Sequence, residues 1–256
     1  MILRRIAQQL KQQHWTGVFI ELVIVILGVF IGLQVQEWAN ARAEQHRADV
    51  LFQQVRGDLD NEKVGLEANK AYLETVAGYA RTAAQGLQSP DAVDPGTWVT
   101  SLYQATQTFT SVSNRATFDE MESTGAIDLI RNPRMRVLLV NYYAFRWANS
   151  DIATAQSPYR QLVRSVLPFK LQQAIKAACG DQVEFVNQLL IMRLPKTCHA
   201  GLAPTDIARA AASLRATRGL QADLNYQSSI IESKIEMIDQ QQQQLDAVIA
   251  AARENP

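Results

Sequence analysis

The chain has 256 residues, and its 25 Lys and Arg residues balance its 25 Asp and Glu residues. This balance removes the strongly basic surface that is typical of nucleic-acid-binding proteins, so no nucleic-acid partner is expected. Sparse Gly and Pro, with abundant Ala, Gln, Leu, Glu and Arg, predict an all-α fold. The length suffices for a tail, one membrane span and one sizeable helical domain or two small ones.

Residues 1–15 predict a cytoplasmic amphipathic tail. Ile2, Leu3, Ile6 and Leu10 fall on one stripe of a helix, and basic and amide side chains fill the remainder. Such a helix lies on a membrane surface. The same residues are also consistent with a simple tail that only sets the topology of the adjacent apolar segment.

Residues 16–38 predict a transmembrane helix. A span needs about 20 mostly apolar residues, and only this part of the sequence supplies them. Trp15 and Trp38 bracket it, roughly 34 Å apart along a helix, which suits two indole rings at the two membrane interfaces. The lipid bilayer is therefore the first expected partner.

The orientation is predicted by the basic residues that precede the span. Arg4, Arg5 and Lys11 favour a cytoplasmic amino terminus and an exported carboxy-terminal domain. A cleaved signal peptide is the alternative, because residues 39–41 have the small-x-small form of a cleavage site. The apolar region is longer than a usual signal peptide requires, which favours the anchor.

One face of the span carries a candidate helix–helix interface. Gly28 and Gly32 form a Gly-x-x-x-Gly pair, which lets two helix backbones approach closely. Glu21 lies on nearly the same face, since it precedes Gly28 by two turns. We expect a homodimer through this face, with Glu21 as an ionisable group. The alternative is that the glycines are incidental and that Glu21 extends to the cytoplasmic interface.

Residues 39–256 predict a periplasmic helical bundle. The span continues as one long amphipathic helix to about Gln85, because no proline precedes Pro90. Gly57, Gly65 and Gly78 are its weak points. The apolar positions at helical spacing are Phe52, Val55, Leu59, Leu66, Leu73, Val76 and Ala80.

Shorter helices are expected after the loop at Pro90. One begins near Thr97, and a second is expected to begin at a Ser113 cap and to end at Gly125. Asn132 and Pro133 predict the start of a third, with Asn as the cap and Pro at the first helical position.

The third of these helices is rich in aromatic residues. Tyr142, Phe145 and Trp147 are expected to pack in the core, together with Met135, Leu138 and Leu139. A ligand pocket lined by Tyr142, Tyr143 and Trp147 is the alternative, because aromatic side chains are also common in binding sites.

The two cysteines, Cys179 and Cys198, predict a disulfide in an exported domain. We expect them to flank a helix over residues 181–194 and to close a helical hairpin. A metal site that adds Asp181 and His199 to the two thiolates is the alternative. No cofactor is expected.

The chain from Pro204 to about Arg253 predicts a second long helix. Ile231, Ile235, Ile238, Leu245 and Ile249 follow a coiled-coil-like spacing of four and three. Gln242 occupies one apolar position of that pattern. The first and last long helices are expected to pair antiparallel and to return the carboxyl terminus towards the membrane.

The sequence carries none of the catalytic motifs that would indicate an enzyme. It lacks a phosphate-binding Gly-rich loop, a His-Glu-x-x-His motif and a nucleophile elbow, and it has three histidines. The leading hypothesis is therefore an anchor, scaffold or interaction module that binds an unknown membrane or periplasmic protein. The alternatives are a ligand-binding sensor that acts through a membrane partner, and a proton-coupled accessory subunit that uses Glu21.

Two stretches resemble a bacterial family of uncharacterised single-pass membrane proteins. The first is Gly-Val-Phe-Ile-Gly-Leu-Gln at 28–34 with Glu-Trp-Ala-Asn-Ala-Arg at 37–42. The second is Glu-Ser-Thr-Gly-Ala-Ile at 122–127 with Ile-Arg-Asn at 130–132. The resemblance implies an inner-membrane setting in a Gram-negative bacterium, and it assigns no activity or functional residue.

Overall fold

The computed structural model describes residues 15–109, 114–145, 150–187 and 189–254, and these residues form helices and one β-hairpin. The all-α fold expected from composition is confirmed. In chain order the elements are α2 (Trp15–Gln88), η1 (Pro90–Ala92), α3 (Pro95–Gln104), α4 (Ala116–Ser123), η2 (Ala126–Leu129), α5 (Pro133–Ala144), α6 (Asp151–Thr154), α7 (Pro158–Val166), α8 (Phe169–Cys179), β1 (Gln182–Val186), β2 (Leu189–Arg193), α9 (Pro204–Arg215) and α10 (Leu220–Arg253).

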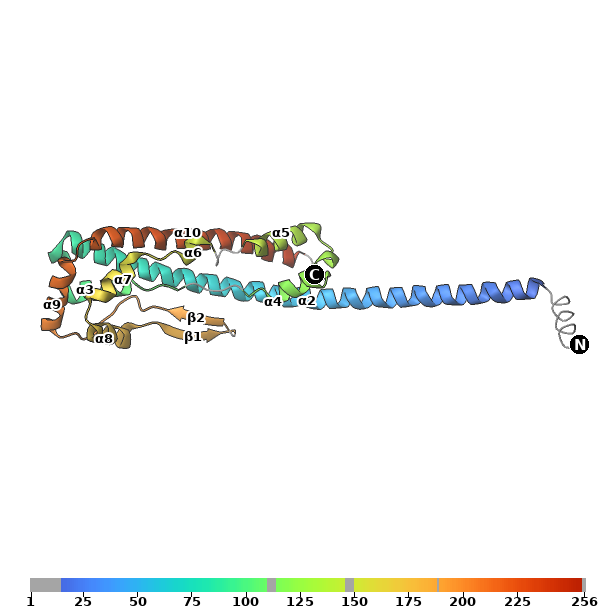
Figure 1. Cartoon of the computed structure of the whole chain (residues 1–256), viewed down its shortest axis with the longest axis horizontal. Coiled ribbons are helices and arrows are strands. Elements are labelled where there is room, and N and C mark those ends of the chain that lie inside the picture. The colour runs from blue at the N-terminus through green and yellow to red at the C-terminus, as the bar shows by residue number, and fades with distance from the viewer. Residues whose placement is uncertain (1–14, 110–113, 146–149, 188, 255–256) are drawn as a thin grey trace, which may run out of the picture.

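Helix α2 is the axis of the molecule. It runs for 74 residues without a break, or about 110 Å at 1.5 Å per residue, and passes through Gly57, Gly65 and Gly78. Its amino-terminal part projects alone from the body, and its carboxy-terminal part lies along the bundle (Figure 1). The apolar stretch and the first bundle helix are therefore one continuous rod.

Helix α10 packs antiparallel against the carboxy-terminal part of α2, as expected. Lys63 pairs with Asp246 at 2.6 Å and Lys70 pairs with Asp239 at 2.5 Å, so a step of seven residues forward on α2 matches seven backward on α10. The carboxyl end of the chain thus returns towards the projecting part of α2 (Figure 1).

The single helix expected from Pro204 to Arg253 was wrong, because α9 and α10 are separate. Gly219 precedes α10 with φ +86°, a left-handed conformation that favours glycine. The chain turns there, so α9 crosses the end of the bundle while α10 runs back along it (Figure 1).

The buried face of α10 repeats every seven residues and differs by one position from the expected one. Its buried positions are Leu220, Leu224, Gln227, Ile231, Lys234, Ile238, Gln241, Leu245, Val248 and Ala252. Gln241 occupies the position that sequence analysis gave to Gln242, which is only half-buried, as is Ile235. A polar side chain therefore recurs at one heptad position of this face.

The three buried polar side chains of this face, Gln227, Lys234 and Gln241, each contact a different element. The Gln227 amide donates to the Ala105 carbonyl at 3.0 Å, at the end of α3. The Lys234 ammonium donates to the Ala155 carbonyl at 3.3 Å, after α6. The Gln241 amide donates to Tyr142 of α5 at 3.2 Å. These bonds fix where the shorter helices sit along α10.

The distal end of the bundle is organised around Trp98 of α3. Its indole N–H donates to the Ala83 carbonyl of α2 at 3.0 Å, and the Arg215 guanidinium lies 4.2 Å from the ring centroid. Gly86 permits this approach, because a Cβ there would overlap the indole. One tryptophan thus joins α2, α3 and α9.

The capping predicted for α5 is confirmed. The Asn132 side chain accepts from the backbone N–H groups of Arg134 and Met135 at 3.0 and 3.2 Å, and Pro133 occupies the first turn. Upstream, Gly125 follows α4 with φ +73°. The proposed Ser113 cap lies outside the described residues, and α4 begins after Arg115.

The aromatic residues of α5 are core, which opposes the ligand-pocket alternative. Tyr142 and Tyr143 are buried, and the Tyr143 ring stacks on Phe118 with centroids 4.3 Å apart. Burial raises the pKa of both phenols. The expectation that Phe145 packs in the core was wrong, because α5 ends at Ala144 and Phe145 is 54% exposed. Trp147 lies outside the described residues.

The helix expected over residues 181–194 was wrong, because these residues form an antiparallel hairpin. Val183 pairs with Met192, and Glu184 pairs with Ile191. Ile191 is buried where β2 packs on α2, whereas Phe185 on the other face of the hairpin is exposed. Val183 and Phe185 alternate with polar residues in β1, whereas β2 is a short continuous apolar run, and both patterns favour strands.

Candidate functional site

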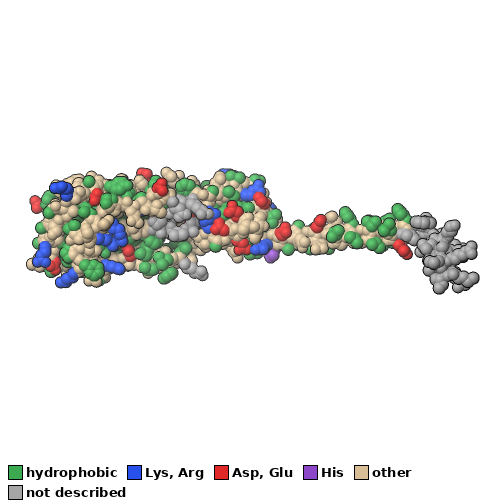
Figure 2. Space-filling view, viewed as in Figure 1, with side chains coloured by type: hydrophobic (Ala, Val, Ile, Leu, Met, Phe, Trp, Pro, Cys, Tyr) green, Lys and Arg blue, Asp and Glu red, His purple; other side chains and the backbone are tan. Residues whose placement is uncertain are grey.

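The amino-terminal part of α2 is apolar and contacts nothing else in the described structure. The large apolar side chains from 19 to 38 are all exposed except Val23, which is half-buried; Leu27 is 52% exposed and Phe30 59%. This is the one helix of the described residues that is long and apolar enough to cross a membrane. Figure 2 shows the narrow rod with hydrophobic side chains beyond the body.

The three residues of the candidate helix–helix interface lie on this rod. Continuity of α2 places Glu21, Gly28 and Gly32 on nearly one face. A Cβ added at either glycine would meet nothing within 4 Å. The structure therefore leaves the face open and shows no partner for it.

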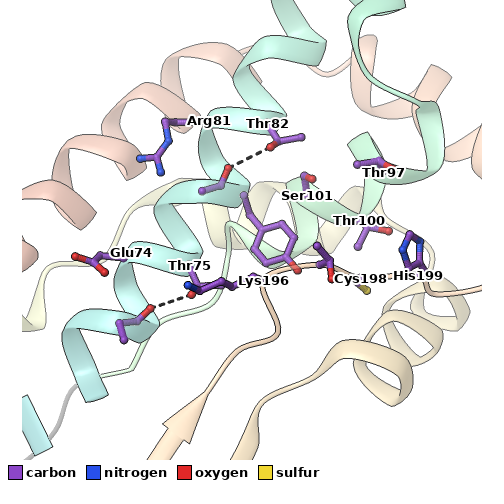
Figure 3. Close-up of a pocket in the computed structure, with 14 residues that line it drawn as sticks. Glu74, Thr75, Arg81, Thr82, Thr97, Thr100, Ser101, Lys196, Cys198 and His199 are labelled. Carbon is purple, nitrogen blue, oxygen red and sulfur yellow. Dashed lines mark hydrogen bonds between the residues drawn. The ribbon is translucent and has the colours of Figure 1, made fainter. Parts of the chain in front are cut away.

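A groove of about 560 Å³ lies at the other end of α2, within the body. A stripe of α2 from Ala71 to Thr82 forms one wall, the first turns of α3 form the second, and residues 196–199 form the third. The stripe spans 11 helical steps, or about 16 Å of helix. Figure 3 shows Glu74 and Arg81 towards one end and Thr97 and His199 towards the other.

Hydroxyl groups dominate the polar lining of the groove. Thr75 and Thr82 donate to the carbonyls of Ala71 and Gly78, which leaves their oxygen lone pairs as acceptors. The α3 wall adds the side chains of Thr97, Thr100 and Ser101, and the third wall adds that of Thr197.

Two of these residues are buried overall and have hydroxyl groups without a hydrogen-bond partner in the described residues. Thr100 is 4% exposed and Ser101 is 1% exposed, and both line the groove. Neither side chain forms a hydrogen bond within the described residues. Their hydroxyl oxygens are not among the fully buried polar atoms that have no partner, so they are accessible from the groove and can bond to water or to a bound molecule.

The charged lining residues are Glu74, Arg81, Lys196 and His199. Within the described residues none of the four forms an ion pair. Arg81 and Lys196 against Glu74 give these three side chains one net positive charge. The groove can therefore hold a polar molecule with a single negative charge.

Two contacts hold the third wall in place. The Tyr79 hydroxyl donates to the Pro195 carbonyl at 2.6 Å, directly before Lys196. Burial raises the pKa of Tyr79, so the phenol stays protonated as a donor. The second contact is a disulfide between Cys179 and Cys198, with Cα atoms 5.5 Å apart, which joins the wall to the end of α8.

The disulfide removes the metal-site alternative. Both sulfur atoms are bonded to each other, and Asp181 accepts a hydrogen bond from Tyr72 at 2.8 Å. Within the described residues no group of three His, Cys, Asp or Glu side chains is placed to hold a metal ion.

Sequence reasoning missed the groove, although α2 carries a signal for it. Ala71, Thr75, Gly78 and Thr82 recur at spacings of four and three, so small and hydroxylated residues form a stripe beside the apolar one. A stripe of this kind leaves space beside a helix. The residues of the other two walls are far away in the sequence and gave no such signal.

Comparison with known proteins adds no relative. No family model matches the chain, and neither the curated proteins nor the solved structures give a match. The family resemblance drawn from residues 28–42 and 122–132 therefore stays an expectation.

Proposed function

We propose that this protein is a membrane-anchored helical interaction module. Residues 16–38 cross the inner membrane and α2 carries the bundle on the far side as a rigid rod. The observation that carries the proposal is the exposure of the apolar side chains 19–38 on the helix that is also the spine of the body. Exposed apolar surface of this length is stable in lipid and costly in water.

Two observations support an amino terminus in the cytoplasm and a body in the periplasm. Arg4, Arg5 and Lys11 precede the span, and basic residues favour the cytoplasmic side. The body contains a disulfide, and disulfides persist in oxidising compartments. The module presents its bundle to a partner protein there.

A homodimer through the span is part of the proposal. Gly28 and Gly32 leave a shallow strip on the rod, and Glu21 lies on the same face. A second copy of the helix fits this strip, because small residues allow close backbone packing in lipid. Dimerisation would bring two bundles side by side.

Protease protection in spheroplasts tests the anchor and its orientation. We expect the full chain in the membrane fraction after alkaline extraction, with the bundle digested by protease added outside. A bundle that is digested only after membrane lysis would contradict the orientation. A mature protein that starts at Arg42 would contradict the anchor.

Fluorescence energy transfer between labelled copies in lipid vesicles tests the dimer. The Gly28→Leu/Gly32→Leu double variant is expected to lose the signal. Phe30→Leu, about 180° away on the helix, is the matched control and should retain it. Equal signals from both variants would place any contact on another face. Glu21→Gln, compared at the same protein density, tests whether the ionisable group contributes to assembly.

A further inference from the structure

We propose that the groove between α2, α3 and residues 196–199 binds a small hydroxylated carboxylate, such as a sugar acid or hydroxy acid. Size, hydroxyl lining and net charge each point to this class. The inference goes beyond the anchoring function and does not depend on it, since the groove lies wholly within the body.

The size of the groove suits a small molecule. About 560 Å³ falls within the 300–1,000 Å³ range of small-molecule sites. Its α2 wall is open because Ala71 and Gly78 have little or no side chain. A Cβ at Gly78 would meet only the Arg81 guanidinium, 3.9 Å away, so the space above this glycine belongs to the groove.

The hydroxyl lining suits a ligand that both donates and accepts hydrogen bonds. Thr100 and Ser101 have hydroxyl groups that line the groove and form no hydrogen bond within the described residues. Opposite them, the Thr75 and Thr82 oxygens have already donated and can only accept. A polyhydroxylated chain satisfies both walls, because each of its hydroxyl groups donates and accepts.

The charge of the lining selects a carboxylate over a neutral sugar. Lys196 has no acid within ion-pair distance in the described residues and lies on the wall opposite α2. Arg81 and Glu74 lie towards one end of the groove (Figure 3), and the Arg81 guanidinium is 3.9 Å from the position of a Cβ at Gly78. A single carboxylate beside Lys196 neutralises the groove, whereas a dianion would meet Glu74.

Calorimetric titration of the full chain in lipid nanodiscs tests the proposal. The probes are glycerate, gluconate, glucuronate and galacturonate, each at up to about 10 mM. Glucose, acetate, phosphate and sulfate are the controls, which lack either the charge or the hydroxyl groups. We expect at least one hydroxylated carboxylate to bind at least tenfold more tightly than every control. If none of the four binds, or if acetate or phosphate binds equally, the proposal is wrong.

Two variants locate the binding. Lys196→Gln removes the central cation and is expected to weaken binding about tenfold. Lys170→Gln, an exposed lysine of α8 without an ion pair in the described residues, is its control. Gly78→Leu fills the groove and should abolish binding, whereas Gly57→Leu on an exposed face of α2 should not.

The same variants can also show that the ligand does not bind in the groove. Binding that survives both Lys196→Gln and Gly78→Leu would place the ligand elsewhere and overturn the assignment. If Gly78→Leu lowers the unfolding temperature, Lys196→Gln alone decides, since an exposed lysine on a loop leaves the fold unchanged. Failure of either result leaves the membrane anchor standing, because the two experiments share no readout.

Discussion

The two halves of α2 belong to one helix and have opposite surroundings. From residue 19 to 47 nearly every side chain is exposed, and the apolar ones are found up to Trp38. From Ala48 onwards apolar side chains recur at heptad spacing and are buried, as at Val55, Leu59 and Leu73. The second half packs against α10 and the shorter helices. Among the described residues, the first half reaches the body at its end, where Arg47 pairs with Glu120 of α4 at 2.8 Å.

The difference shows that a helix with apolar residues on all sides and a helix with apolar residues on one side need different surroundings. A helix that is apolar on all sides cannot be covered by one neighbour, so it requires lipid or several helices. A helix with a heptad stripe needs only one covered side. Residues 39–47 between them are mostly polar or alanine and mostly exposed, and they separate the apolar stretch from the bundle by about 13 Å of helix.

A matched pair of leucine truncations gives the largest expected contrast between the halves. Leu59 is 0% exposed, so Leu59→Ala should lower the free energy of unfolding of the body by about 2–5 kcal/mol. Leu27→Ala should leave it unchanged, because Leu27 contacts no part of the body. Thermal unfolding in nanodiscs by circular dichroism measures both, and similar losses would mean that the rod packs on the body.

The sequence predicted the parts of the fold that depend on local pattern. The long helix, the Asn132 cap and the antiparallel return of α10 are consequences of periodicity and capping chemistry. The hairpin at 182–193 was missed because two short strands were taken for part of a helical hairpin between the cysteines. The groove was missed because its walls come from three distant segments, and only the tertiary fold brings them together.

Loss of the disulfide is expected to have the next largest effect, and it should affect the body and not the exposed part of α2. Cys179 and Cys198 are 19 residues apart, and a loop of that size contributes about 3 kcal/mol to stability in the chain-entropy model. The Cys179→Ser/Cys198→Ser variant should lose about this amount in urea unfolding. Reductant should reproduce the loss in the wild-type chain and have no effect on the variant. Membrane association should not change.

The buried face of α10 differs by one position from the face expected from the sequence, and this difference can be tested. The interrupted isoleucine pattern placed Gln242 in the apolar face, yet Gln241 is the buried residue. The pattern was ambiguous because Ile235 and Ile249 lie one position beyond Lys234 and Val248 of this face. A buried polar residue such as Gln241 is missed when the buried face is assigned from apolar residues alone.

Substitution of the two glutamines should distinguish the two registers. Gln241→Ala removes the donor to Glu62 and Tyr142 and should cost about 1–3 kcal/mol. Gln242→Ala should change stability by less than about 0.5 kcal/mol, because a half-exposed side chain loses little. Urea unfolding of both variants measures the difference, and a larger loss at Gln242 would support the register inferred from the isoleucines.

The smallest expected effect concerns Lys234, which is 5% exposed on the buried face of α10. Burial lowers the pKa of its ammonium below the ordinary 10.5, and its hydrogen bond goes to a backbone carbonyl. Lys234→Met keeps the length of the side chain and removes the buried charge, so it should stabilise the body by about 1 kcal/mol at neutral pH.

Between the lowered pKa of Lys234 and 10.5 the unfolded chain binds more protons than the folded one, so wild-type stability rises with pH there. The advantage of the variant should therefore shrink as the pH approaches 10.5, and urea unfolding of both chains across that range measures it. An advantage that is independent of pH would mean that the pKa of Lys234 is the same in the folded and unfolded chains, so that packing alone is responsible.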